Sequence, residues 1–208
     1  MLNKYVCIHT HNYQPSRENP WTGVVDKQDS AYPYHNWNER IAVECYTANT
    51  EAKILDNYGR LLCNVNNYSK TSFNFGATLL TWLEKYSHIT YQRILTADRL
   101  SIKNFNGHGS AIAQPYYHNI LPLATDKDKY TNVSLGIDDF VARFNRYPEG
   151  IWLPETAVDI KTLECLANLQ IKYTILSPYQ AGCVSNWLDV SGGRIDPTTP
   201  YKVYLPSG

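Results

Sequence analysis

The stretch "GIWLPETAVDIKTLECLANLQIKYTILS", Gly150 to Ser177, decides the fold class. Its run "GIWL" predicts a short strand, "DIKTLECLANLQ" predicts a helix with Asp159 as N-cap, and "YTILS" predicts another strand. A further helical pattern, "TNVSLGIDDFVARFNRY", comes just before this stretch. Strands that alternate with helices pair in parallel through right-handed crossovers. The sequence therefore predicts an α/β fold with parallel strands and crossover helices.

The part of the chain before residue 131 extends this alternation. The run "KYVCI" predicts the first strand, "RIAVECYTANTEAKILDNYG" predicts a helix that stops at Gly59, and "RLLCNVN" predicts the second strand. Apolar residues at helical spacing then mark "FGATLLTWLEKY" and "TYQRILTADRLSIKNF" as helices, before the glycine-flanked loop "NGHGSAIAQPYYHNILPLA". The last segment, "DVSGGRIDPTTPYKVYLPSG", has turn residues and no closing helix. A barrel of parallel strands needs roughly 250 residues, so we expect residues 1–208 to be a single domain and the N-terminal part of a longer one.

Composition narrows the partners of the chain. Nineteen basic and nineteen acidic residues give a net charge of zero, and no Lys/Arg block occurs, so neither nucleic acid nor a membrane surface is expected as a partner. The five cysteines are odd in number and lie in mostly apolar runs, which predicts buried free thiols. With no leader pattern at the start and no 18-residue apolar span, we expect a cytoplasmic protein.

Polar residues follow the predicted strands, where ligands bind in alternating α/β folds. His9 and His11 follow the first strand, "NNY" follows the second, and Glu155 follows "GIWL". We expect the side chains of His9, His11 and Glu155 to converge on one ligand site at the carboxyl ends of the strands. Glu155 has two interpretations: an acid favoured by the N-terminus of the next helix, or a carboxylate nucleophile or base held rigid by Pro154. Trp152 is either a core residue or one wall of a sugar site.

Three roles remain open for the histidine pair. His9 and His11 share a face of an ideal strand, which suits a metal site with a third ligand, hydrogen bonds within the protein, or contacts to sugar hydroxyls. The glycine-flanked loop adds His108, Gln114 and His118, which can make directional contacts with a neutral polyol. Motifs for phosphate cradles, serine-hydrolase elbows and paired zinc cysteines are absent from the sequence.

Three strings in this order, "HTHNYQPSRENPW", "GHGSAIAQPYYHNILPLA" and "EGIWLPETAVD", resemble the N-terminal part of the catalytic domain of glycoside hydrolase family 57, in a poorly characterised branch. The resemblance implies a distorted, incomplete (β/α)7-type barrel, no cofactor or metal, and retaining hydrolysis or glucanotransfer on α-linked oligosaccharides or polysaccharides. It implies that Glu155 is the nucleophile and that the acid/base aspartate comes from a later strand, beyond Gly208. It implies substrate contacts for these residues: His9, His11, Gln14, Trp21, His108, Gln114, His118 and Trp152.

The chain departs from the family pattern at two places. Asn12 and Tyr13 are inserted before Gln14, where the usual motif is His-x-His-Gln-Pro, and Gln114 stands where a glutamate is usual. Two other functions stay open at the level of sequence. One is a metal-dependent polysaccharide deacetylase, which shares a histidine-rich strand end but usually carries an Asp-Asp pair there. The other is a carbohydrate-binding protein without catalytic activity.

Overall fold

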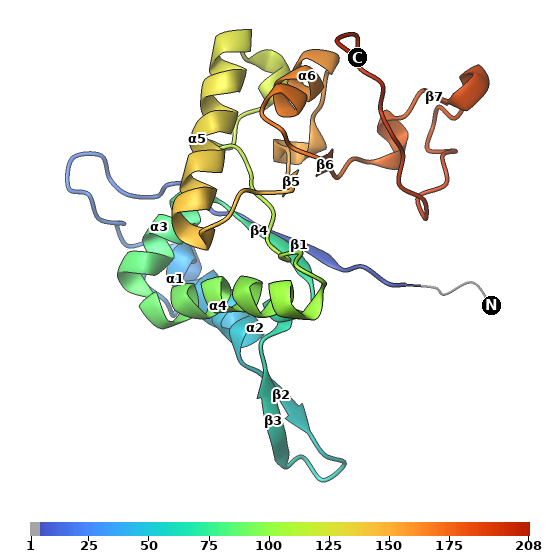
Figure 1. The fold of residues 1–208 in the computed structure, drawn as a ribbon. Coiled ribbons are helices and arrows are strands. Elements are labelled where there is room, and N and C mark those ends of the chain that lie inside the picture. Colours follow the sequence, from blue (N-terminus) through green and yellow to red (C-terminus); the bar gives the residue numbers. More distant parts are fainter. Residues whose placement is uncertain (1–4) are drawn as a thin grey trace.

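The computed structural model describes residues 5–208, and its parallel strands form one continuous array whose spatial order follows the chain (Figure 1). The array consists of β1 (His9–Asn12), β4 (Ser72–Phe75), the extended segment 110–113, β5 (Gly150–Ile151) and β6 (Tyr173–Thr174). Parallel bridges from Phe73 to Ala111 and from Ala113 to Ile151 join the middle segment to its two neighbours. The predicted parallel strands with intervening helices are confirmed, and within residues 5–208 the array does not close into a barrel.

The other strands form antiparallel pairs, and the helices lie between and around the strands. The paired strands are β2 (Ala52–Leu55) with β3 (Leu61–Val65), and β7 (Cys183–Val184) with β8 (Leu188–Asp189). The helices are α1 (Trp37–Ile41), a π-helical stretch (Ala42–Thr47), α2 (Ala48–Thr50), α3 (Ala77–Tyr86), α4 (His88–Asn104), α5 (Asp126–Phe144) and α6 (Ile160–Asn168). Single 3-10 turns occur at Asp29–Ala31, Asn67–Ser69, Leu121–Leu123, Pro154–Thr156, Pro178–Gln180 and Ser185–Trp187.

Polar side chains fix the ends of the helices that flank β5. Thr125 accepts a hydrogen bond from the backbone N–H of Asp128 and begins α5, five residues earlier than predicted. Asn145, with φ 54°, ends α5 in the left-handed conformation that short polar residues tolerate. Asp159 caps α6 as predicted, because its carboxylate accepts from the N–H of Thr162. β5 is thereby held between two helices with defined ends.

The core lies where α3, α4 and α5 pack on the parallel array. Its fully buried members come from strands and helices alike: Phe73, Leu79, Leu83, Ile94, Val133, Ile151 and Leu153. Gly136 of α5 lets this helix approach the backbone of the middle segment, since an added Cβ would stand 2.1 Å from the carbonyl oxygen of Gln114. The close approach fixes Gln114 at the end of its strand.

The start of the chain differs from the sequence prediction. Residues 5–8 are not in a strand, and β1 covers His9–Asn12 instead; Lys4, the first residue of the predicted strand, lies outside the described residues. The exposed Val6 and Ile8 explain the shift, because no element covers them and the pairing with β4 begins only at His9. The two histidines therefore lie on the first strand and not after it.

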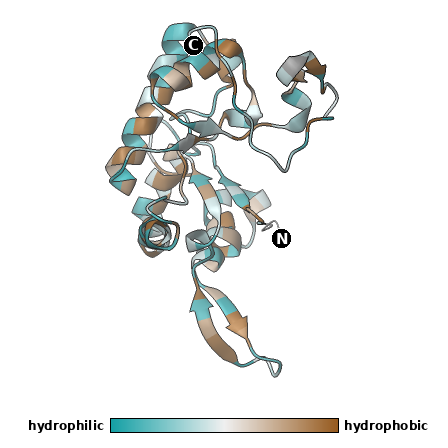
Figure 2. Cartoon of the chain, turned by 45° about the vertical axis from the view of Figure 1, so that its right-hand side comes forward, coloured by the Kyte–Doolittle hydropathy of each residue, from teal (hydrophilic) through white to brown (hydrophobic). Residues whose placement is uncertain are grey.

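A hairpin replaces the end of the first predicted helix, "RIAVECYTANTEAKILDNYG". The helical region ends at Thr50, after which β2 and β3 form an antiparallel hairpin that projects from the body (Figure 1) and contains hydrophobic residues (Figure 2). The exposed apolar residues of the two strands are Ile54, Leu55, Leu61 and Leu62. Gly59 does not end a helix; it has φ +77° and sits in the turn of the hairpin. The predicted second strand exists as β3 but is not part of the parallel array. The residues "NNY" that follow it therefore do not lie at the carboxyl ends of the parallel strands. The neighbour of β1 is β4, which the sequence reading missed.

The cysteines are free but not buried. Cys7, Cys63 and Cys183 are exposed, while Cys45 and Cys165 are partly buried. The prediction of burial was wrong because Cys7 precedes β1, Cys63 lies on the projecting hairpin, and Cys183 belongs to the short pair β7–β8. None of the helices within residues 5–208 combines the length and the apolar character needed to cross a bilayer.

Candidate active site

Side chains from several segments meet beside the carboxyl ends of the parallel strands. β1 contributes His9 and His11 from the same face, and the segment after β5 contributes Trp152 and Glu155. The loop that follows residue 113 contributes His118. The structure thus brings together residues that are more than a hundred positions apart in the sequence, at the edge where alternating α/β folds bind their ligands.

Five rings with nearly parallel planes form a cluster, which we call the ring stack. Its members, in the order of their ring contacts, are His9, Trp152, His11, His118 and Tyr13, and the centroids of His11 and Tyr13 also lie 6.4 Å apart. Successive ring centroids lie 5.2, 4.8, 5.4 and 3.9 Å apart, and the planes of neighbouring rings differ by only 13° to 18°. The stack forms a largely apolar wall whose ring edges carry nitrogen atoms and a hydroxyl group, a combination suited to a ligand with hydroxyl groups and apolar faces.

Asn74 of β4 links the two histidines of β1 to Gln114. Its side chain is fully buried, and its Oδ1 lies 3.1 Å from Nε2 of His9. Its Nδ2 lies 2.9 Å from Nδ1 of His11 and donates to Oε1 of Gln114 at 2.6 Å. Gly76 leaves room for this arrangement, because a Cβ there would lie 2.5 Å from Nε2 of Gln114 and 3.0 Å from Tyr13.

Glu155 stands on a tight turn that presents its carboxylate to solvent. The residue has φ 54° and ψ 20°, and Thr156 also has φ 54°, so two consecutive side-chain-bearing residues adopt the left-handed conformation. The side chain of Glu155 is 73% exposed, and its Oε1 lies 3.4 Å from Nε2 of His118. Because α6 begins only at Ile160, Glu155 is not in its first turn, which removes the helix-terminus interpretation.

Helix α5 holds the loop that carries His118. The buried side chain of Asn132 accepts a hydrogen bond from the N–H of Tyr117 at 2.7 Å and donates to the carbonyl of Tyr117 at 2.9 Å. His118 itself is nearly buried, with its side chain 9% exposed. The imidazole is therefore held beside the rings of Tyr13 and His11 while its Nε2 faces the carboxylate of Glu155.

Burial keeps the imidazoles of β1 neutral. Burial lowers the pKa of His9, while the hydrogen bond with Asn74 acts in the opposite direction. Burial lowers the pKa of His11 most; the hydrogen bond with Asn74 acts in the opposite direction, and the neighbouring His118 and His9 lower the pKa further while Glu155 raises it. Both histidines therefore remain uncharged at neutral pH, as suits contacts with an uncharged ligand.

The cluster contains most of the unsatisfied buried polar groups. Within residues 5–208, the buried side-chain atoms without a hydrogen-bond partner are Gln114 Nε2, His118 Nδ1, Trp152 Nε1 and the hydroxyl of Tyr68. The first three belong to residues of this cluster, and only Tyr68 lies apart in the core. Buried polar groups are normally hydrogen-bonded, so this concentration marks a place where hydroxyl groups of a ligand or water complete the bonding.

The other residues expected to bind substrate lie elsewhere. Gln14 turns to the guanidinium of Arg17 and to the hydroxyl of Tyr46. Trp21 is 93% exposed on the loop between β1 and α1. His108 pairs with Glu149 at 2.8 Å, before the amino ends of segment 110–113 and of β5. Of the expected substrate contacts, the structure thus gathers His9, His11, Gln114, His118 and Trp152 around Glu155.

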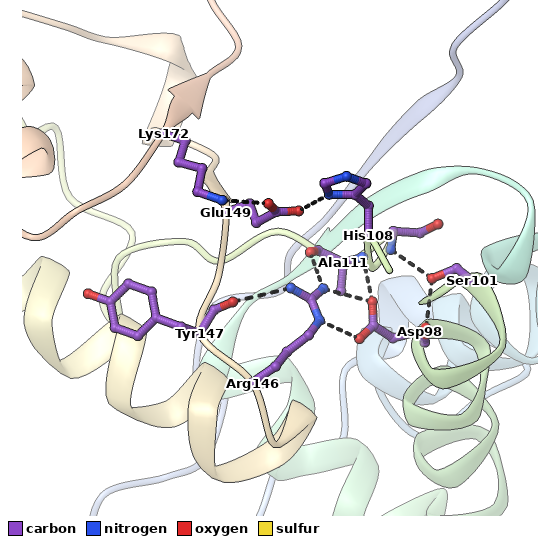
Figure 3. A network of polar contacts seen from close by, with 9 residues as sticks. Asp98, Ser101, His108, Ala111, Arg146, Tyr147, Glu149 and Lys172 are labelled. Carbon is purple, nitrogen blue, oxygen red and sulfur yellow. Dashed lines mark hydrogen bonds and ion pairs between the residues drawn. The ribbon is translucent and has the colours of Figure 1, made fainter. Parts of the chain in front are cut away.

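Charged residues at the amino edge of the array form a separate network (Figure 3). The buried carboxylate of Asp98 accepts two hydrogen bonds from Arg146, both at 2.8 Å, and Arg146 also donates to the carbonyl of Ala111. Glu149 bridges His108 and Lys172 nearby. This network ties α4 and the end of α5 to the middle segment and is remote from Glu155, so we assign it to stability.

The described residues offer no metal cage. Within residues 5–208, no three His, Cys, Asp or Glu side chains are grouped as metal ligands. Both ring nitrogens of His9 already have protein partners, since Nδ1 lies 2.9 Å from the hydroxyl of Ser72 and Nε2 faces Asn74. These partners favour hydrogen-bonding over ligating roles for the histidine pair.

Sequence reasoning missed two members of the cluster. Asn74 lies in a four-residue strand directly before a helix, and the alternation in "SFNF" was the available signal. Tyr13 was visible as an insertion in the first motif, but its stacking on His118, 105 positions later, depends on the fold.

Comparison with known proteins places the chain in a family. The sequence matches the family model of glycosyl hydrolase family 57 over residues 7–207. Alpha-amylase 1 of Dictyoglomus thermophilum is 28% identical over 103 residues, which make up 50% of this chain and 14% of that amylase. The chain thus spans only a small part of the curated relative that it matches.

Two solved structures share the fold at low identity. The 4-alpha-glucanotransferase from Thermococcus litoralis superposes with a TM-score of 0.52 at 19% identity, over 86% of this chain and 24% of that one. An exo-type maltose-forming amylase from Pyrococcus sp. ST04 gives a TM-score of 0.54 at 15% identity, over 82% and 28% of the two chains. Since the family match extends over nearly all of the sequence and agrees with the motifs quoted above, this chain belongs to glycosyl hydrolase family 57.

Proposed function

We propose that the chain carries the nucleophile and one wall of the sugar site of a retaining glycosidase or glucanotransferase that acts on α-linked glucans. The observation that carries the proposal is the presentation of Glu155 on a left-handed turn beside the ring stack. The family membership and the names of the relatives, which include amylases and a glucanotransferase, support the substrate class.

The geometry supports the following chemistry. An oxygen of the Glu155 carboxylate attacks the anomeric carbon, the glycosidic C–O bond breaks, and the leaving oxygen takes a proton from a second carboxyl group. Water or another sugar hydroxyl then attacks the glycosyl ester, gives its proton to that second group, and frees Glu155. The ring stack binds the sugar, with His118 holding the free carboxylate in place between turnovers.

We place the second carboxyl group outside residues 1–208. Retaining enzymes hold their two carboxyl groups about 5 to 5.5 Å apart, and the acids that follow Glu155 have other partners. Asp159 binds Lys129 and Thr162, Glu164 binds Ser207, Asp189 binds Arg194, and Asp196 binds Thr198. On this proposal, the parallel array is the N-terminal portion of a distorted (β/α)7-type barrel in a longer catalytic domain.

The substitution Glu155→Gln in the full-length protein tests the nucleophile. We expect turnover of maltooligosaccharides to fall to background while the melting temperature stays unchanged, because the amide keeps the shape of the side chain but cannot form a glycosyl ester. Glu164→Gln is the matched control, since it changes an acid nine residues away that faces Ser207, and we expect it to keep turnover.

Mass spectrometry provides a second, independent test of Glu155 as the nucleophile. A slowly hydrolysed fluorinated α-glucosyl substrate should add one glycosyl mass to the peptide that contains Glu155. Near-normal turnover of Glu155→Gln, or a label on a different carboxylate, would end the assignment. A pure binding protein would bind maltooligosaccharides without any label.

A further inference from the structure

Asn74 is the only side chain of β4 that contacts both histidines of β1. It is fully buried, and it lies opposite His11 in the register of β1 and β4. Its amide contacts His9, His11 and Gln114 at distances between 2.6 and 3.3 Å. A planar amide has two hydrogen atoms to donate and one oxygen to accept, so these contacts restrict the protonation of their partners.

The donors and acceptors can be assigned one at a time. One hydrogen of Nδ2 goes to the carbonyl oxygen of Gln114, at 2.6 Å, and the other goes to Nδ1 of His11, at 2.9 Å. Oδ1 of Asn74 lies farther from this nitrogen, at 3.3 Å, so we take Nδ1 of His11 as the acceptor of the shorter bond, which puts the proton of this neutral imidazole on Nε2. Oδ1 of Asn74 accepts from Nε2 of His9, so His9 also carries its proton on Nε2, and its Nδ1 accepts from the hydroxyl of Ser72.

We infer that Asn74 is a positioning residue that fixes His9 and His11 as neutral Nε2–H tautomers, so that His11 offers a hydrogen-bond donor that Asn74 does not use. The ring stack holds the plane of His11 between Trp152 and His118, while Asn74 decides which edge carries the proton. The ligand chemistry that fits this edge is the oxygen of an uncharged hydroxyl group. This last step rests on the proposed sugar site, whereas the assignment of tautomers does not.

Nitrogen-15 NMR of imidazole-labelled protein tests the assignment without any activity measurement. The chain has six histidines, and His9→Gln and His11→Gln variants identify the two sets of signals. In the full-length wild type at neutral pH, we expect the Nδ1 shift of both residues to be that of an unprotonated nitrogen and the Nε2 shift to be that of a protonated one. A protonated Nδ1 at His11 overturns the inference, because it means that the amide of Asn74 is turned by 180° or does not act.

The substitution Asn74→Asp reverses the expected pattern. A carboxylate only accepts hydrogen bonds, so we expect the proton of His11 to move to Nδ1 and the pKa of both imidazoles to rise. Asn57→Asp, in the exposed turn of the hairpin, is the matched control and should leave both tautomers unchanged. If Asn74→Asp does not fold, the wild-type spectrum still decides the question.

Binding separates this inference from the proposed function. We expect Asn74→Asp to weaken maltooligosaccharide binding roughly two- to tenfold, the loss of about one neutral hydrogen bond. Wild-type protein with Nε2–H tautomers but no affinity for maltooligosaccharides would contradict the sugar site and leave the role of Asn74 intact. An unchanged His11 tautomer in folded Asn74→Asp would contradict the role of Asn74 alone.

Discussion

Nε2 of His118 lies 3.4 Å from Oε1 of Glu155, and the two residues come from different crossover segments of the parallel array. The loop of His118 is held by α5, whereas Glu155 stands on a turn after β5 in which two residues have positive φ. The carboxylate is thus aimed by backbone conformation and not by a dense set of hydrogen bonds. Such conformations cost free energy and persist where the surroundings enforce them.

Relief of this strain at Thr156 should stabilise the protein. Thr156 is β-branched and has φ 54°, and its carbonyl accepts a hydrogen bond from Gln180 at 2.5 Å. We expect Thr156→Gly to raise the free energy of unfolding by about 0.5 to 1 kcal/mol, since the relief of left-handed strain exceeds the added freedom of the unfolded chain. Urea denaturation measures the change. The control Thr131→Gly, on the exposed face of α5, should lower the free energy of unfolding by about 1 kcal/mol. A lower free energy of unfolding in both variants would contradict backbone strain at Thr156.

A methyl group at Gly136 should disturb the end of the middle segment. Its Cβ would overlap the backbone of Gln114 and Pro115, at 2.1 and 2.9 Å. We expect Gly136→Ala to lower the free energy of unfolding by about 1 to 3 kcal/mol, although alanine favours helices. Gly182→Ala has no atom within 4 Å of the new Cβ and should be close to neutral. Thermal unfolding of the two variants gives the comparison, and equal melting temperatures would contradict the close approach.

The pair Asp98–Arg146 should contribute far more to stability than Glu149–Lys172. Asp98 is fully buried, and its removal leaves the guanidinium of Arg146 without its partner. We expect Asp98→Ala to lower the free energy of unfolding by about 3 to 5 kcal/mol. Glu149→Ala breaks contacts of more exposed side chains, for which about 0 to 1 kcal/mol is typical. Denaturant titrations should show this order; a reversed order would contradict the buried network.

The histidines of β1 should make stability depend on pH in one direction. Burial places the pKa of His9 and His11 below the ordinary value of 6.5, so the unfolded chain binds more protons than the folded chain as pH falls through 6.5. Stability is therefore complete above this value and decreases below it. We expect the free energy of unfolding of wild type to fall between pH 7 and 5, with a shallower fall in His9→Gln. If the free energy of unfolding falls equally with pH in wild type and His9→Gln, His9 does not contribute to the pH dependence of stability.

Removal of metal should have no effect on function. Asn74 and Ser72 occupy both nitrogens of His9, and on our proposal it is His11 that contacts a sugar hydroxyl. We expect excess chelator to leave maltooligosaccharide turnover and binding of the full-length protein unchanged. Stoichiometric metal in the purified protein, together with loss of function on its removal, would instead support the deacetylase alternative.

Local signals in the sequence sufficed for the elements around Glu155. The N-cap at Asp159, the apolar spacing of α6 and the short runs of β5 and β6 lie within thirty residues of one another, and the structure has all of these elements, with β5 and β6 shortened to two residues each. The prediction of a helix over the residues of the β2–β3 hairpin failed for a physical reason. "AKIL" is as compatible with a helix as with a strand, and its choice depends on pairing with β3.

The candidate site was only partly visible because its bonds are long-range. His9 and His11 could be grouped with Glu155 from strand ends alone, but Asn74 bonds to His11, 63 positions before it, and to Gln114, 40 positions after it. Likewise, His108 and Gln114 belong to one predicted loop, yet the extended segment 110–113 lies between them. His108 is therefore at the amino edge of the array and Gln114 at the carboxyl edge. No local pattern encodes either relation.

The spatial order of the parallel strands also sets an order of folding. The pairing of β5 with β6 closes a loop of about twenty residues, from Ile151 to Thr174, whereas the pairing of β1 with β4 must close one of 63 residues, from His9 to Ser72. Loop-closure entropy makes the longer closure costlier by ~0.9 kcal/mol. We therefore expect β1 to dock late, after the chain around Glu155 has its shape. His9 and His11 then reach Asn74 only in the last stage, so a partly folded molecule would display the carboxylate of Glu155 without a complete ring stack beside it.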